Sequence, residues 1–206
     1  MALSLGRAAR RELDDRSAPL AGLVAVFVFA AQMLNFPVGA GTSGHLIGAT
    51  LAAVLVGPAT ATLCLTVVLA VQALLFADGG VTALGTNVLL MGVVAVWVGY
   101  GVFRGSLVVL PRRLASVPVA AGIGALVSVP AAALSFVALY AVGGAAPIPI
   151  GTLAATMGGW HVVIGLGEAA ITLLAVSSIV TARPDLVHGA LGHLPSLRLR
   201  TAEVVG

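Results

Sequence analysis

The sequence contains no lysine, a single cysteine and few charged residues, and these shortages exclude several classes of protein. Charged residues make up 8% of the 206 positions, whereas soluble domains contain roughly 25%. Aromatic residues are also scarce, at 5%, while hydrophobic residues reach 60%. A soluble globule and a pair of packed soluble domains are both excluded, and one helical membrane unit is the simplest interpretation.

Features that would indicate a disulfide-stabilised protein or an enzyme are missing too. Because Cys64 is the single cysteine, no disulfide can form within the chain. It lies in an apolar run, where a thiol usually behaves as a small hydrophobic group. The sequence has no GxSxG, HExxH or Walker A motif. We therefore expect a protein that is not an enzyme.

Six apolar stretches predict six membrane-spanning helices, because a spanning helix needs about 20 mostly apolar residues. They cover residues 20–36, 46–56, 59–77, 83–103, 115–142 and 152–182. The second is too short to span alone, and the breaks between helices fall at proline and glycine. The predicted fold is an all-α polytopic membrane helix bundle over residues 20–182, between a juxtamembrane strap (1–19) and a polar tail (183–206).

The distribution of positive charge tests the predicted number of membrane-spanning helices. All ten arginines fall on the cytoplasmic side if the strap is cytoplasmic, while the three opposite loops contain none. The formal net charge of +3 therefore reflects topology, and we expect no nucleic-acid partner. A multi-pass protein of the inner (plasma) cell membrane is predicted, with its N-terminus and tail cytoplasmic and with His45 and Asp78 near the outer face.

His45 is the candidate metal ligand. Neutral imidazole is the commonest protein ligand for nickel, copper, zinc and cobalt. His45 follows GTSG at the start of a helix, so its ring can project into an outward-facing cavity. The alternative is a histidine bonded to a neighbouring backbone carbonyl.

Four other polar residues are candidates for supporting this ligand or the fold. Asp78 is expected to form a helix C-cap and turn, and Asn87 to join helices by hydrogen bonds. His161 and Glu168 are seven residues apart, so they share a helix face about 10 Å apart, too far for both to bind one ion. Glu168 is expected to face the bundle and orient a loop or helix.

The residues from Asn35 to Asn87 resemble the CbiM/NikM family, the substrate-binding membrane components of energy-coupling factor transporters for cobalt and nickel. The similarity rests on NFPVGAGTSGHLIGATLAAVLVGP and VQALLFADGGVTALGTNVLLMG, with HVVIGLGEAAIT and RRELDDRSAPL elsewhere. It implies a divalent ion held by nitrogen atoms in a nearly square-planar arrangement. These come from an N-terminal amine, the backbone and side chain of a histidine at the second position, and the histidine of GTSxHL, which corresponds to His45.

The sequence departs from this pattern at its start, where Met1 is followed by Ala2. The family's Met-His-Ile opening and first helix are absent, so the expected fold is the seven-helix family fold minus its first helix. Three of four ligand atoms are missing. A start codon assigned too far downstream is the explanation we favour; a separately supplied helix, or a variant that binds no metal in this way, are the others.

The resemblance implies capture of Co(II) or Ni(II) as a transported substrate, without a resident cofactor, to serve cobalamin biosynthesis or nickel enzymes. It also implies partners: a transmembrane coupling protein, two cytoplasmic ATPase subunits and a small accessory membrane subunit, within the lipid bilayer. One alternative is a scaffold or assembly subunit without metal binding. Another is a membrane-embedded metalloenzyme, which needs His45, Asp78 and His161 to converge within about 4–5 Å. His188 and His193 are expected in solvent.

Overall fold

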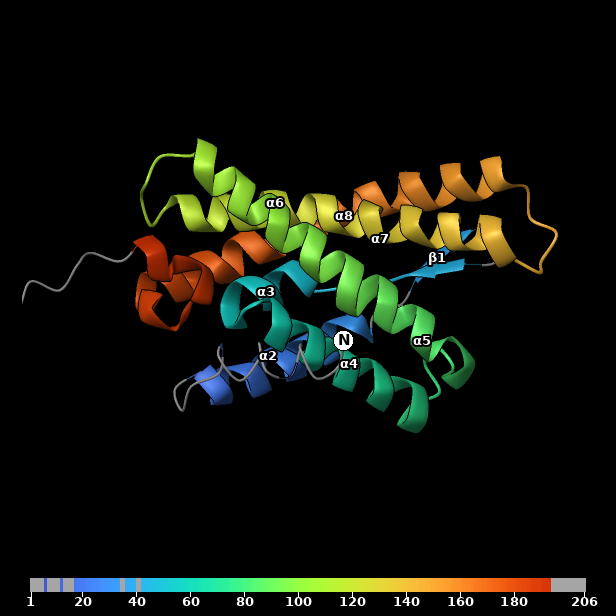
Figure 1. The fold of residues 1–206 in the computed structure, drawn as a ribbon, viewed down its shortest axis with the longest axis horizontal. Helices are drawn as coiled ribbons and strands as arrows, with labels where there is room; N and C mark the ends of the chain where they lie inside the picture. Colours follow the sequence, from blue (N-terminus) through green and yellow to red (C-terminus); the bar gives the residue numbers. More distant parts are fainter. Residues whose placement is uncertain (1–5, 7–11, 13–16, 34–35, 40–41, 194–206) are drawn as a thin grey trace, which may run out of the picture.

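The computed structural model describes residues 6, 12, 17–33, 36–39 and 42–193, and the expectations for the rest of the strap and for residues 194–206 lie outside this part. The fold is a helical bundle (Figure 1). Its α-helices are α2 (Ser17–Gln32), α3 (Ala49–Val56), α4 (Pro58–Leu75), α5 (Leu84–Asn87), α6 (Val96–Val109), α7 (Ser116–Gly143) and α8 (Ile150–Ala182). The all-α prediction is confirmed, apart from one small hairpin formed by β1 (Phe36–Gly39) and β2 (Thr42–Gly44).

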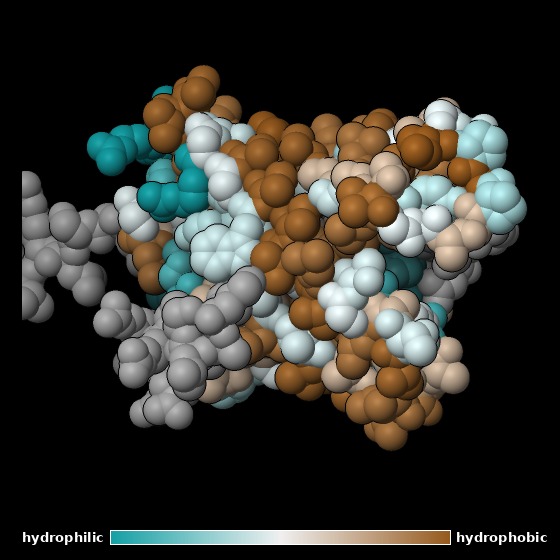
Figure 2. Space-filling view, turned by 45° about the vertical axis from the view of Figure 1, so that its right-hand side comes forward, coloured by the Kyte–Doolittle hydropathy of each residue, from teal (hydrophilic) through white to brown (hydrophobic). Residues whose placement is uncertain are grey.

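Four helices in the described residues have the length and composition to cross a membrane. They are Pro58–Leu75, Val81–Val109, Ser116–Gly143 and Ile150–Ala182. The second of these runs without interruption through a 3-10 turn η1 (Val81–Ala83), α5, a π-helix η2 (Val88–Ala95) and α6. Figure 2 shows hydrophobic side chains covering the middle of the molecule, which confirms the prediction of a membrane bundle.

Several helix boundaries differ from those predicted, each for a local reason. α2 ends at Gln32 rather than at residue 36, because the β1–β2 hairpin begins there. The fourth predicted helix continues past Arg104 to Val109, since an arginine does not break a helix and Pro111 does.

α3 is a short helix at the centre of the bundle. All eight of its residues are buried, and it is preceded by a non-helical segment, residues 45–48. The stretch from Thr42 to the end of α3 is at most about 35 Å long. Its first seven residues, up to Gly48, extend about 3.3 Å each, and its eight helical residues rise about 1.5 Å each. A membrane core is about 30 Å thick, so this stretch is long enough to cross it only because its first half is extended and its second half is helical.

Gly48 is the residue at which this segment turns into α3. Its φ is +70°, and a Cβ at this position would lie 2.9 Å from a Val28 methyl group. An L-residue would therefore face both backbone strain and a clash. Non-helical backbone at such depth is tolerated because protein buries it.

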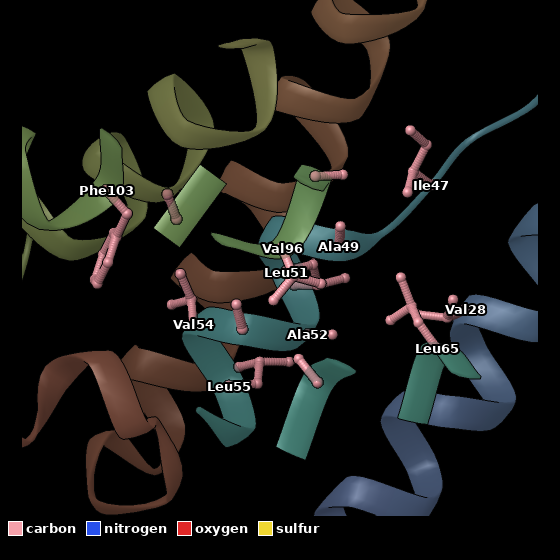
Figure 3. Packing of buried hydrophobic residues seen from close by; sticks show 14 of the residues in the cluster. Val28, Ile47, Ala49, Leu51, Ala52, Val54, Leu55, Leu65, Val96 and Phe103 are labelled. Atoms are coloured by element: carbon pink, nitrogen blue, oxygen red, sulfur yellow. The ribbon is translucent and has the colours of Figure 1, made fainter. Parts of the chain in front are cut away.

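The hydrophobic core surrounds α3. Leu51, Ala52, Val54 and Leu55 of α3 lie among Leu65 of α4, Val96 and Phe103 of α6, and Val28 of α2 (Figure 3). α7 and α8 pack against each other along their lengths (Figure 1). The core therefore holds α3, and with it the segment before it, in place.

The two ends of the bundle differ in character. The hairpin end carries β1–β2 and the loops after α4 and α7, and the arginine end carries the α6–α7 loop and the chain after α8 (Figure 1). The four arginines within the described residues, Arg104, Arg112, Arg113 and Arg183, lie at the arginine end and are exposed.

The tail after α8 corrects one prediction. Residues 184–193 do not extend into solvent; they fold as two 3-10 turns, η3 (Pro184–Leu186) and η4 (His188–His193), and η4 packs against α3. Val187 and Ala190 are completely buried. His188 is half-buried beside the Tyr100 ring, at a centroid distance of 6.2 Å. His193 is also partly buried. The hydrophobic Leu186-Val187 and small Gly189-Ala190 pairs explain why this polar-looking tail packs onto the core.

Candidate metal site

A cavity of about 320 Å³ lies towards the hairpin end, where the segment before α3 meets α8. It is lined by Gly44, His45, Ile47, Asp78, Gly79, Asn87, Leu90, Met91, Ala132, Ala133, Phe136, Met157 and His161. Three of the sequence-predicted residues besides His45 are in this set, namely Asp78, Asn87 and His161. The cavity is therefore the place in the described structure where the predicted site residues meet.

His45 is half-buried at the edge of the segment that leads into α3. Its Nδ1 lies 2.9 Å from the carbonyl oxygen of Leu46. A carbonyl can only accept, so Nδ1 carries the proton and donates it, which leaves the lone pair on Nε2. The ring therefore bonds a neighbouring carbonyl, as the alternative interpretation expected, and a ring bound in this way can still offer its other nitrogen to a ligand.

Glu168 does not line the cavity but fixes the backbone that carries His45. Its carboxylate is 2% exposed. One oxygen accepts a hydrogen bond from the Ile47 amide at 2.7 Å, and the other accepts one from the Gly48 amide at 2.9 Å. Gly48 is the N-cap of α3 and Ile47 precedes it, so the carboxylate satisfies two amides at the start of the helix and interacts favourably with the helix dipole.

Gln32 holds the same peptide from the opposite side. Its side-chain amide donates to the Ile47 carbonyl at 2.8 Å. Both the N–H and the C=O of Ile47 are therefore bound to side chains of α8 and α2. Sequence reasoning did not identify Gln32, because a glutamine in an apolar helix has no signal that names its partner.

His161 lines the same cavity and bonds a backbone carbonyl through Nδ1, as His45 does. Its Nδ1 donates to the Met157 carbonyl one turn earlier in α8, at 2.8 Å. Within the part of the chain that the structure describes, neither Nε2 has a hydrogen-bond partner. Met157 and Met91, which sequence reasoning missed, add thioethers to the lining. Met157 was detectable, since it is four residues before His161 on the same helix face.

Asp78 lies in the turn between α4 and α5, and Asn87 is the last residue of α5. The Asp78 amide donates to the Gln72 carbonyl at 3.1 Å, next to Ala77 with φ of +55°, which is a left-handed helix end. Asn87 donates to the Gly79 carbonyl at 3.4 Å. The C-cap of α4 is Phe76 and not Asp78, which lies two residues further along in the turn and lines the cavity.

The cavity does not bring three ligands together. Among the described residues, no group of three histidine, cysteine, aspartate or glutamate side chains is arranged to hold a metal ion. The convergence of His45, Asp78 and His161 that a metalloenzyme would require is therefore not found there. His188 and His193 lie at the other end of the bundle.

A second carboxylate that sequence reasoning missed caps the next helix. Glu12 of the strap accepts hydrogen bonds from the Ala59 amide at 3.2 Å and the Thr60 amide at 2.7 Å. A Cβ on Gly57, where φ is +88°, would meet this carboxyl group at 2.5 Å. Glu12 therefore closes the turn between α3 and α4, at the end of α3 away from the cavity.

Comparison with known proteins identifies the chain's relatives. A protein of Haloquadratum walsbyi is 41% identical over 181 residues, which cover 88% of this chain and 80% of that protein. The fused nickel transport protein NikMN of Rhodobacter capsulatus is 34% identical over 193 residues, covering 86% of this chain and 54% of NikMN. A crystal structure of a truncated transition metal transporter matches with a TM-score of 0.71 at 31% identity, over 87% of this chain and 88% of that one.

These matches agree with the family resemblance of the GTSGHL and HVVIGLGE segments. The family match extends over residues 1–186, which includes every residue of the cavity. The family and the named relatives are metal transport proteins and not enzymes, as predicted. This chain belongs to the CbiM family, the cobalt uptake substrate-specific transmembrane region.

Proposed function

We propose that this chain is the substrate-specificity component of an energy-coupling factor transporter, and that it captures Co(II) or Ni(II) for uptake. The observation that carries the proposal is the position of His45, which lines the cavity while its Nδ1 is bound to a backbone carbonyl. Imidazole nitrogen is a suitable ligand for these borderline metals. The ion is the transported substrate, and cobalamin biosynthesis or nickel enzymes are its proposed use.

The surroundings of the cavity support capture of a divalent cation. A charged ion enters a low-dielectric bundle only where polar or charged groups replace the water that it loses. The acidic residue Asp78 and the imidazole residue His45 both line the cavity. Glu168 and Gln32 hold the peptide after His45 rigidly, so the ring does not have to be ordered when the ion binds.

The distribution of arginine supports the orientation. We infer that the arginine end faces the cytoplasm of the inner (plasma) membrane, with the hairpin end and cavity outside. The proposed partners are a transmembrane coupling protein, two cytoplasmic ATPase subunits and a small accessory subunit, none of them a nucleic acid. The described residues include no Walker A loop, so the energy for uptake has to come from other subunits.

The test is uptake of radioactive nickel and cobalt by cells that express the chain together with its transporter subunits. We expect His45→Ala to abolish uptake, because it removes the imidazole at the cavity. His193→Ala is the matched control, since it removes a partly buried histidine at the arginine end. Uptake by His45→Ala at the level of the control would refute the proposal.

A further inference from the structure

Exposed arginines and exposed valines lie together where α6 leads into α7, at the arginine end of the bundle (Figure 1). Val108 and Val109, the last two residues of α6, are 86% and 87% exposed. Arg104 lies about one and a half turns before them, and Arg112 and Arg113 follow in the loop. These five residues are called the arginine–valine patch. Among the described residues, the side chains of Arg112 and Arg113 have no hydrogen bond or ion pair.

The turn that carries Arg112 and Arg113 is held by hydrogen bonds of its own backbone. The Arg113 amide donates to the Pro111 carbonyl at 2.8 Å, and the Ser116 amide donates to the Arg113 carbonyl at 3.0 Å. The Ser116 hydroxyl also donates to the Pro111 carbonyl, at 2.7 Å. Both arginines therefore belong to one fixed turn, and a molecule that binds them does not have to order this backbone.

The lengths of the helices place the patch at the level of the lipid headgroups. Val81–Val109 has 29 residues and Ser116–Gly143 has 28. At about 1.5 Å per residue, each helix is about 42–44 Å long. The hydrocarbon core of a membrane is about 30 Å thick, and the headgroup regions extend it to about 40–45 Å. The end of α6 and the start of α7 therefore lie at the boundary between acyl chains and headgroups.

Acidic residues that could neutralise the patch are scarce. The sequence has no aspartate or glutamate between Asp78 and Glu168. Of the described acidic residues at the arginine end, Glu12 accepts hydrogen bonds from amides of α4, and Asp185 accepts two from Arg183, at 3.0 and 2.8 Å. Because the sequence contains no lysine, every basic group of the patch is a guanidinium, whose planar fork matches the oxygens of a phosphate.

We propose that the arginine–valine patch binds an anionic phospholipid of the surrounding membrane. Arg112 and Arg113 bind the phosphate of its headgroup, and Val108 and Val109 contact the upper part of its acyl chains. An acidic segment of a protein would satisfy the arginines but offers no acyl chain to the valines. The inference requires that the chain spans a membrane, and it does not depend on capture of an ion, so each of the two proposals can fail without the other.

The experiment is native mass spectrometry of the purified full chain in a non-ionic detergent, titrated separately with phosphatidylglycerol and phosphatidylcholine. Arg112→Gln and Arg113→Gln are the test variants. Arg183→Gln is the matched control, because Arg183 is exposed at the same end but is already paired with Asp185. We expect phosphatidylglycerol to bind the wild type more tightly than phosphatidylcholine does. Each test variant should bind it about fivefold more weakly, and the control should bind it as the wild type does.

Two results would overturn the inference. One is equal affinity of the wild type for phosphatidylglycerol and phosphatidylcholine, which would favour an acidic protein segment as the partner of the arginines. The other is equal affinity of Arg112→Gln, Arg113→Gln and Arg183→Gln for phosphatidylglycerol. Salt gives a second readout on the wild type, because screening shortens the reach of a charge from about 10 Å at 0.1 M to about 3 Å at 1 M. Binding of phosphatidylglycerol that does not weaken over this range would also contradict the proposal.

A valine variant separates a lipid from free phosphate as the ligand. Val108→Ser combined with Val109→Ser keeps every arginine and removes the apolar surface, and both positions are exposed, so we expect the fold to be retained. This variant should bind phosphatidylglycerol more weakly than the wild type, and inorganic phosphate should not displace the lipid from the wild type. Unchanged lipid affinity of the variant together with displacement by inorganic phosphate would identify a phosphate site and refute the lipid assignment.

Discussion

Glu168→Gln removes one of the two acceptors that hold the peptides before α3. The carboxylate accepts from the Ile47 amide at 2.7 Å and from the Gly48 amide at 2.9 Å, one at each oxygen. A glutamine keeps one acceptor oxygen and places an NH2 group, itself a donor, against the other amide. One backbone N–H is then left buried without an acceptor, which costs about 1–3 kcal/mol of unfolding free energy.

The same change should weaken metal capture. His45 is two residues before Ile47, so a shift of this backbone moves its ring relative to the cavity. Loss of residues that position a metal ligand typically lowers affinity by about 10- to 100-fold. We therefore expect nickel affinity to fall by about that factor in Glu168→Gln.

The assay is thermal unfolding in detergent followed by tryptophan fluorescence, together with nickel titration by calorimetry. Thr172→Val is the matched control, since Thr172 is buried four residues further along α8 and its hydroxyl has no hydrogen-bond partner among the described residues. Removing this hydroxyl should leave stability unchanged or raise it. Unfolding and nickel binding of Glu168→Gln that both match Thr172→Val would refute the anchoring role of Glu168.

Two further predictions concern the arginine end. Glu12→Gln weakens the capping of the Ala59 and Thr60 amides and should lower the unfolding free energy by about 0.5–2 kcal/mol without changing nickel affinity, as measured by the same two assays. Burial lowers the pKa of His188 below its usual 6.5; Arg104 adds to this and Glu12 opposes it. The unfolded tail then binds more protons than the folded one, so docking of η4 is stable above pH 6.5 and weakens as pH falls through and below it. Hydrogen-exchange protection of the Ala190 amide, corrected for intrinsic rates, should decrease as the pH is lowered from about 7.5 to about 5.5. The same decrease in His188→Gln would show that His188 is not the group responsible.

Much of the fold could be predicted because its signals are local. Apolar runs indicate membrane helices, and the break at Gly57-Pro58 follows from backbone properties of single residues. His45 was identified as a candidate for a similar reason, since the GTSGHL segment carries its glycines and the proposed ligand in consecutive positions. These features depend on neighbours within a few residues, so a linear reading captures them.

Contacts between distant segments depend on the packing of the whole bundle. Glu168 was predicted to orient a loop or helix, but its partners, the amides of Ile47 and Gly48, are about 120 residues away and carry no side-chain signal. The same is true of Glu12, which caps α4 from the strap, and of η4, which packs on α3.

The sequence by itself determined that the chain is a membrane helix bundle and that an imidazole stands beside a glycine-rich loop. Only the tertiary structure decided which nitrogen of that imidazole is available, which carboxylate holds its backbone, and that His161 borders the same space. The physical reason is that hydropathy and chain stiffness are set by residues that are neighbours in the sequence. A site, in contrast, is made where helices far apart in the chain are forced together by burying their small and apolar faces.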